Sequence, residues 1–267
     1  MPALACPAPG RTLRSAAGAF LLFAACTVAE GAEASLPAEL SVPATNVLAA
    51  VSARYSAVTN VSCTVRRETE SGGSSVGAAV SRVVWSRGGR LNVQALAPAE
   101  KRTVIDGVSV WTAAKGGRPS SRPVAEQNLV QAANLYSVPA SPEERLAPLD
   151  PATATEIVPA AEPFARQIAF RPRTAPTGTA SATTVVSFDA EGRVVRLEAF
   201  ADESRTAMLG SLSFESAVEA APGAWLFGRE VFETAVDGRP VRTVSRFDRL
   251  RVNEALPPSI FDPKAFF

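Results

Sequence analysis

The alternation of apolar and polar side chains with a period of two is the feature that most constrains the fold of this chain. Between Val61 and Arg66, for example, Val61, Cys63 and Val65 alternate with polar residues. Segments of this kind recur as far as Val252 and number about nine to eleven, which is typical of short strands that bury one face of a sheet. The chain is therefore predicted to be mainly β.

Turn residues separate these segments. Gly88-Gly89, Asp106-Gly107 and Asp237-Gly238 are two-residue hairpin signals, and residues 189–192 form a further turn. Sequential strands with short turns favour an antiparallel, up-and-down sheet that curls toward a barrel. The sequence has no parallel βαβ pattern, no P-loop and no GxGxxG motif.

Two segments are predicted to be helical rather than extended. Pro43 to Asn60 carries an apolar stripe at helical spacing, with Thr45 or Asn46 as the expected N-cap. Residues 114–163 are rich in Pro, Ala, Gly and Ser, with expected helices at 126–136 and 142–146. We interpret 114–163 as a lid insertion that covers the sheet, since its leucines need a surface to pack on; a mobile linker is the alternative.

The N-terminus predicts export. Arg11 and Arg14 precede the uncharged run Ala16 to Val28, which is too short to span a bilayer, and Ala34 ends a small-x-small cleavage motif. Residues 1–34 are thus expected to be a signal peptide and 35–267 a single periplasmic domain. In the alternative, Cys26 ends a loose lipobox and is lipidated, which would anchor the protein to the outer membrane.

Composition narrows the possible chemistry. The chain contains no histidine, which excludes Ser-His-Asp and Cys-His catalysis and zinc sites that need histidine. The net charge of +1 offers no basic surplus for nucleic acid. Cys63 would be the only cysteine after cleavage at Ala34, and its alternation with valines indicates a small buried hydrophobe. We expect no enzyme activity, no catalytic residues, no metal and no cofactor.

Three stretches carry a resemblance to a known family. The first is the opening helix and strand, "ATNVLAAVSARYSAVTNVSCTVRRE". The second is a run of short strands, "VVWSRGGRLNVQALAPAEKRTVIDGVSVWT". The third is the C-terminal end, "VRTVSRFDRLRVNEALPPSIFDPKAFF". In this order they resemble the periplasmic outer-membrane lipoprotein carrier and sorting proteins (LolA/LolB-like).

The resemblance implies an unclosed β-barrel covered by helices, with a hydrophobic cavity between sheet and lid that takes the acyl chains of lipoproteins or lipids. It implies a monomer that meets an inner-membrane release complex and an outer-membrane acceptor. Arg87 falls at the position of an arginine that latches the lid in some carriers. The family often has proline next, whereas Gly88 follows here, so a solvated turn arginine is the alternative.

One set of strand side chains would line such a cavity. The candidates are Trp85, Val93, Val110, Phe170, Phe188, Leu197, Phe214 and Val231. These residues could equally fill a packed core, in which case a secreted β scaffold that binds a protein partner is the alternative function. A slip of one residue in register would exchange the two faces, and the sequence does not fix that register.

Overall fold

The computed structural model describes residues 37–124, 145–173 and 182–267. The predicted signal peptide, Cys26 and the expected helix at 126–136 lie outside the described residues. Of the expected helix at 142–146, Arg145 and Leu146 are described, and both are helical.

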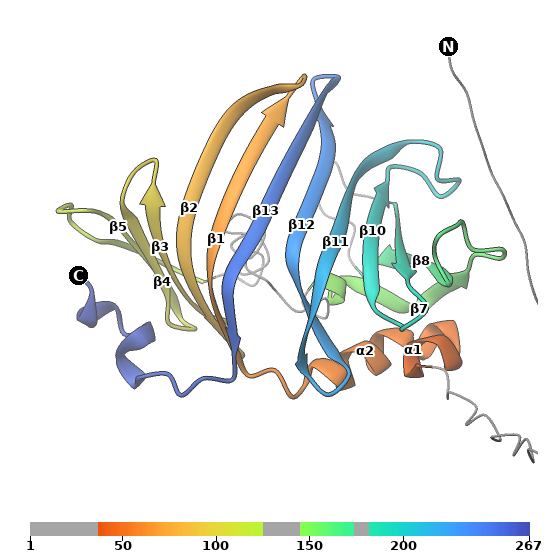
Figure 1. Cartoon of the computed structure of the whole chain (residues 1–267), viewed down its shortest axis with the longest axis horizontal. Helices are drawn as coiled ribbons and strands as arrows, with labels where there is room; N and C mark the ends of the chain where they lie inside the picture. Colours follow the sequence, from red (N-terminus) through yellow and green to blue (C-terminus); the bar gives the residue numbers. More distant parts are fainter. Residues whose placement is uncertain (1–36, 125–144, 174–181) are drawn as a thin grey trace, which may run out of the picture. The chain divides into compact units, whose positions relative to one another are not determined.

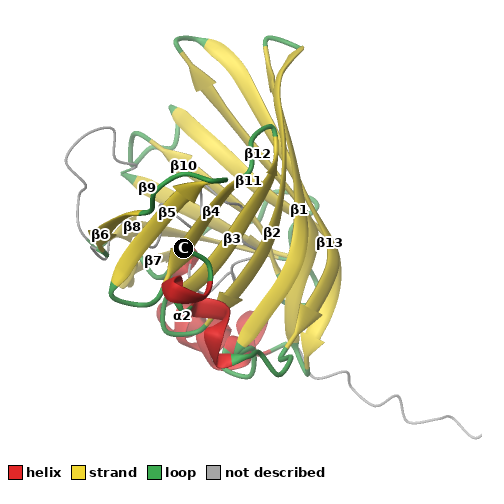
Figure 2. Ribbon diagram, turned by 90° about the vertical axis from the view of Figure 1, so that its left-hand side faces the viewer, coloured by secondary structure: helices red, strands yellow, loops and turns green. Residues whose placement is uncertain are grey.

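The described strands form one antiparallel sheet in the order β6-β5-β4-β3-β2-β1-β13-β12-β11-β10-β9-β8-β7 (Figures 1 and 2). The sheet is curved, and its end strands, β6 and β7, do not pair with each other, so the barrel is not closed. The strands are β1 (Asn60–Ser71), β2 (Ser74–Ser86), β3 (Arg90–Ala97), β4 (Lys101–Ile105), β5 (Ser109–Ala114), β6 (Ser120–Pro123), β7 (Leu149–Glu156), β8 (Arg166–Pro172), β9 (Thr183–Phe188), β10 (Val194–Phe200), β11 (Met208–Ala221), β12 (Ala224–Val236) and β13 (Arg239–Val252).

The predicted fold class is confirmed, but the sheet has 13 strands where about nine to eleven were expected. The additional strands are β6 and β7, which form the two edges of the sheet. Both fall within residues 114–163, which the sequence assigned to a loop-and-helix insertion. The two ends of that segment are therefore part of the sheet, which corrects its predicted extent.

The helices near the N-terminus are shorter than predicted. α1 (Ala38–Ser41) is followed by the 3-10 turn η1 (Ala44–Asn46) and by α2 (Val47–Tyr55). Asn46 is the N-cap residue of α2, but its side chain makes no capping hydrogen bond. The helix buries Val47, Val51 and Tyr55, three residues of the predicted apolar stripe. In Figure 1, α1 and α2 lie along one end of the strands β10 to β12.

The two faces of the sheet differ in chemistry. We call the face that carries Val61 and Trp85 the concave face; its buried side chains share one apolar cluster with α2. The opposite, convex face carries ion pairs between neighbouring strands, such as Arg66 with Asp248 at 2.8 Å. The two side chains of this pair are 65% and 46% exposed, so we interpret this part of the convex face as a solvated surface.

The C-terminal segment packs on the convex face. It contains two 3-10 turns, η2 (Pro258–Phe261) and η3 (Pro263–Ala265). Asn92 Nδ2 donates to the carbonyl oxygen of Ile260 at 2.7 Å, and the Arg102 guanidinium lies 4.2 Å from the ring centre of Phe266. The C-terminal segment therefore covers the convex side of β3 and β4 and does not occupy their concave side.

The turn between β9 and β10 approaches α1 closely at Gly192, which has a φ of +74°. A Cβ there would lie 2.7 Å from the Cβ of Pro37, a rigid neighbour. We expect Gly192→Ala to lower the free energy of unfolding by about 2–3 kcal/mol, from the left-handed backbone and the clash together. Urea unfolding measures it.

Gly238→Ala is the matched control, since Gly238 has a similar φ of +73° but nothing within 4 Å of the added Cβ. It should lose only the backbone contribution of about 1–2 kcal/mol. Equal losses in the two variants would show that the contact of Gly192 with Pro37 carries no strain.

Candidate functional site

The concave face is lined by one continuous apolar cluster. α2 and the loop after it contribute Val51, Tyr55 and Val58, and the strands contribute most of the rest. Cys63 belongs to this cluster, and burial raises the pKa of its thiol to about 12, so the thiol is protonated at neutral pH. This agrees with the interpretation of Cys63 as a small buried hydrophobe.

Seven of the eight predicted cavity residues lie on the concave side and pack in or against this cluster. They are Trp85, Val93, Val110, Phe170, Phe188, Leu197 and Phe214, of which Leu197 is only partly buried.

Val231 is the exception. It pairs with Val244, which pairs with Glu68 on the convex face, and the residue of β12 that pairs with Phe214 is Glu230. The selection of Val231 was therefore one residue out of register, and we exclude it from the cavity lining.

Arg87 connects the C-terminal end of α2 to the sheet by hydrogen bonds. Its Nε donates to the carbonyl oxygen of Val58 at 3.0 Å, and its Nη2 donates to that of Tyr55. A cation at the C-terminal carbonyls of a helix is favourable both as a hydrogen-bond donor and toward the helix dipole. Arg87 thus holds α2, and its action on the 114–163 segment stays a prediction.

A polar network secures the other side of the helical region. Arg54 Nη2 lies 2.8 Å from a carboxylate oxygen of Glu39, whose side chain is almost fully buried. Arg166 donates to the backbone oxygen of Glu39 and forms a two-pronged ion pair with Glu156, both distances being 2.8 Å. The Tyr55 hydroxyl donates to the carbonyl oxygen of Trp225. Together these bonds fix α1 and α2 against β8 and β12.

The burial of Glu39 has a consequence for pH dependence. Burial raises the pKa of this carboxyl above 4.5, against the opposing effects of a backbone hydrogen bond and Arg54. The folded state therefore binds this proton more tightly than the unfolded state. The stability that this group contributes is fully present below pH 4.5 and is lost as the pH rises through the raised pKa.

Glu39→Gln removes this titration, so stability should depend on pH differently in the variant. The free energy of unfolding of the wild type, relative to the variant, is expected to fall as the pH rises above 4.5. Urea unfolding at several pH values measures both profiles. Parallel profiles would contradict the assignment.

A buried ion pair interrupts the apolar concave face. Arg145 Nη2 lies 2.8 Å from a carboxylate oxygen of Glu230, and the two side chains are only 11% and 6% exposed. The Arg145 guanidinium also lies 5.9 Å from the ring centre of Phe214. Burial raises the pKa of Glu230, while the charges of Arg145 and Arg67 oppose that rise. Sequence analysis missed this pair, because the two residues are 85 positions apart.

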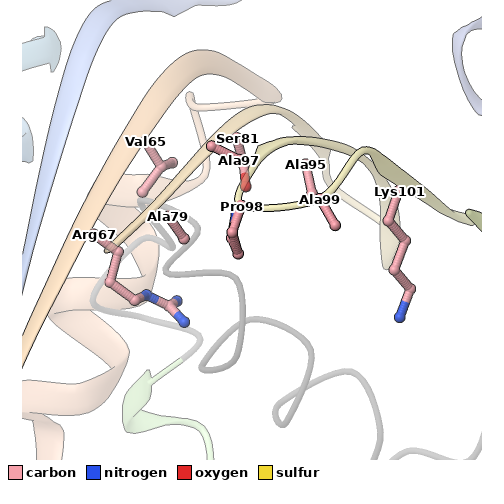
Figure 3. Close-up of a pocket in the computed structure, with 9 residues that line it drawn as sticks. All are labelled: Val65, Arg67, Ala79, Ser81, Ala95, Ala97, Pro98, Ala99 and Lys101. Atoms are coloured by element: carbon pink, nitrogen blue, oxygen red, sulfur yellow. The ribbon is translucent and has the colours of Figure 1, made fainter. Parts of the chain in front are cut away.

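A hollow of about 260 Å³ lies on the concave face over β1 to β3 (Figure 3). Its lining consists mainly of small or apolar side chains, with Arg67 and Lys101 as the cationic members. The small and apolar members include Val65, Ala79, Ser81, Ala95, Ala97 and Pro98. This volume is close to the lower end of the range for small-molecule pockets, about 300–1,000 Å³.

The concave face combines an apolar surface and a hollow with a few charged side chains. Within residues 37–124, 145–173 and 182–267, no three His, Cys, Asp or Glu side chains are grouped so that they could hold a metal ion. In the same part of the chain, no helix has the length and apolar character needed to cross a membrane.

No family model and no curated protein matches the sequence. Solved structures do match. A DUF1329 family protein from Desulfovibrio piger aligns with a TM-score of 0.57 at 12% identity, over 84% of this chain and 98% of that one. An outer membrane lipoprotein-sorting protein domain assigned in Vibrio parahaemolyticus aligns with a TM-score of 0.57 at 15% identity, over 83% and 97%.

A LolA superfamily protein from Nitrosomonas europaea aligns with a TM-score of 0.52 at 11% identity, over 84% of this chain and the whole of that one. At these identities the likeness shows a shared fold. It confirms, for the fold, the resemblance that the sequence predicted.

Proposed function

We propose that this chain is a non-enzymatic carrier that binds acyl chains of lipoproteins or lipids on the concave face of its sheet. The observation that carries the proposal is the hollow, lined by small and apolar side chains, on an unclosed sheet. Each methylene buried there contributes about 0.8 kcal/mol, so affinity requires no specific polar contact. The fold shared with a lipoprotein-sorting domain supports the same function.

The proposal places the protein in the periplasm after removal of residues 1–34, with lipidation of Cys26 as the anchored alternative. It acts as a monomer between an inner-membrane release complex and an outer-membrane acceptor, without a cofactor. Two sets of ion pairs fit this function, the network around Glu39 and the Arg145–Glu230 pair. They hold the helices and the sheet in place around the apolar surface.

Filling the hollow tests the proposal. Ala79 points into it from β2, whereas the next residue toward the N-terminus, Ala78, pairs with Glu68 and faces the convex side. In protein lacking residues 1–34, Ala79→Phe is expected to weaken binding of a fluorescent fatty acid by about tenfold, the effect of losing roughly two buried methylenes. Fluorescence titration and displacement by unlabelled oleate measure it.

Ala78→Phe is the matched control and should leave the affinity unchanged. If both variants bind like the wild type, the hollow is not the binding site. If the wild type itself shows no saturable, displaceable binding, the proposed function is wrong.

A further inference from the structure

The concave face continues beyond the hollow, toward the hairpins that join β1 to β2 and β12 to β13 (Figure 1). One row of side chains crosses this part of the sheet in register, each residue paired with the next: Leu197, Leu212, Phe232, Thr243 and Thr69. Its two leucines pack against the concave cluster, which assigns the row to that face. The next row on the same face, closer to the hairpins, consists of Ala199, Gly210, Thr234, Val241 and Ser71. We call these two rows the strip.

The strip contains no charged residue, although the strands that carry it are rich in charge. The residues between its two rows point to the convex face, and they are Glu198, Ser211, Glu233, Arg242 and Glu70, each paired with the next. Four of these five residues are charged. Because successive side chains of a strand point to opposite faces, the same strands have a charged convex side and an uncharged concave side.

Three hydroxyl groups of the strip make hydrogen bonds within the sheet. Thr69 Oγ1 lies 3.2 Å from Thr243 Oγ1, and Thr234 Oγ1 donates to the carbonyl oxygen of Leu209 at 2.8 Å. A hydrocarbon that covers these groups leaves their bonds intact, so it avoids the cost of burying an unpaired polar group. Phe232 is 44% exposed, and covering its ring with a hydrocarbon removes apolar surface from water.

The strip adjoins the hollow and is long enough for one acyl chain. Thr69 lies two residues after Arg67 on the same face of β1, and Arg67 lines the hollow. From β10 to β1 the strip crosses five strands, a distance of about 19 Å at the usual strand spacing. The hydrocarbon core of a bilayer, about 30 Å thick, contains two chain lengths, so one acyl chain reaches about 15 Å.

We propose that the ligand carries at least two acyl chains, one held in the hollow and the other lying across the strip. The inference rests on the proposed function and narrows the class of ligand to diacyl lipids and molecules that carry a diacyl group. A single-chain fatty acid fills only the hollow and leaves Phe232 exposed. The second chain is bound by apolar contact alone, because the strip offers it no charge.

Two lipids that share a head group and differ in the number of chains test this. Protein lacking residues 1–34 is loaded with the fluorescent fatty acid. The probe is then displaced by dioctanoyl-phosphatidylcholine or by the single-chain octanoyl-lysophosphatidylcholine, each below its micelle concentration. We expect the two-chain lipid to act at a concentration about tenfold lower, which corresponds to about 1.4 kcal/mol. We call the ratio of the two concentrations the two-chain preference.

Phe232→Glu places a carboxylate in the middle of the strip. It should bring the two-chain preference close to one and leave displacement by the single-chain lipid as in the wild type. Ala235→Glu is the matched control, because Ala235 is an exposed residue on the convex side of the same strand. It should leave the preference at about tenfold. Phe232→Ala should lower the preference to about threefold, and it tests the strip even if Phe232→Glu does not fold.

The possible outcomes separate this inference from the proposed function. Equal displacement by both lipids from the wild type would overturn the two-chain ligand and leave acyl binding in the hollow intact. A two-chain preference that both Phe232 variants retain, or that Ala235→Glu lowers as much as Phe232→Glu, would overturn the strip as the site of the second chain. A wild type that binds neither the probe nor the lipids would overturn the proposed function itself.

Discussion

Glu230→Ala is expected to lower the free energy of unfolding by about 3–5 kcal/mol, because it removes the carboxylate that faces a buried guanidinium. Glu230 and Arg145 are 6% and 11% exposed, so water replaces little of the lost interaction. Urea unfolding followed by circular dichroism measures the loss.

Glu233→Ala on the same strand is the matched control. Glu233 pairs with Arg242 at 3.3 Å, but the two side chains are 53% and 42% exposed, and the loss should stay below about 1 kcal/mol. Replacing both partners of the buried pair, in Arg145→Met with Glu230→Met, should recover most of the stability, since no charge is then left buried. A double variant as unstable as Glu230→Ala would contradict this explanation.

Phe188→Ala is expected to cost a similar amount, about 3–5 kcal/mol. Phe188 is fully buried in the concave cluster, so its loss leaves a cavity among packed neighbours. Thermal and urea unfolding measure the effect. The result also decides how Phe188, a predicted cavity residue, acts: a large loss of stability with unchanged acyl binding identifies it as core rather than lining.

Phe232→Ala provides the comparison on the same face. Phe232 pairs with Leu212 and Thr243 on the concave side but is 44% exposed, so its removal should cost less than about 1.5 kcal/mol. Equal losses in Phe188→Ala and Phe232→Ala would show that burial on this face does not govern stability.

The central strands were predicted well because they bury every second side chain, which gives the sequence an apolar–polar alternation. The Asp106-Gly107 turn shows why local signals succeed: Asp106 Oδ1 accepts from the backbone N–H groups of Val108 and Ser109 at 2.8 and 2.7 Å. Edge strands lack that pattern. All four residues of β6 are exposed, and β7 contains Pro151, which an edge strand tolerates.

Contacts between distant strands were beyond sequence reasoning. A bulge falls at Arg249 in β13, where backbone φ is positive, and it changes which residues share a face. The predicted register of β12 was wrong by one residue, so Val231 was assigned to the concave face in place of Glu230. The partner of Glu230 is Arg145, 85 residues earlier in the sequence, and no periodicity could have indicated it.

The family resemblance was limited in the same way, since it did not predict the hydrogen-bond partners of Arg87. Arg87 directly follows β2, and its hydrogen bonds go to the carbonyls of Tyr55 and Val58 at and just after the end of α2. No sequence pattern marked small residues such as Ala79 and Ala97 as lining residues. A hollow is space that the surrounding side chains do not fill, and their arrangement is known only in three dimensions. The resemblance could suggest a cavity, but only the three-dimensional structure could locate it.

Native mass spectrometry of the protein purified from the cell envelope without detergent tests the central claim most directly. The account predicts a species heavier than the mature chain by one acyl-bearing molecule, which organic extraction removes and which Ala79→Phe reduces. A single species at the mass of the bare chain, before and after incubation with fatty acids and phospholipids, would contradict it.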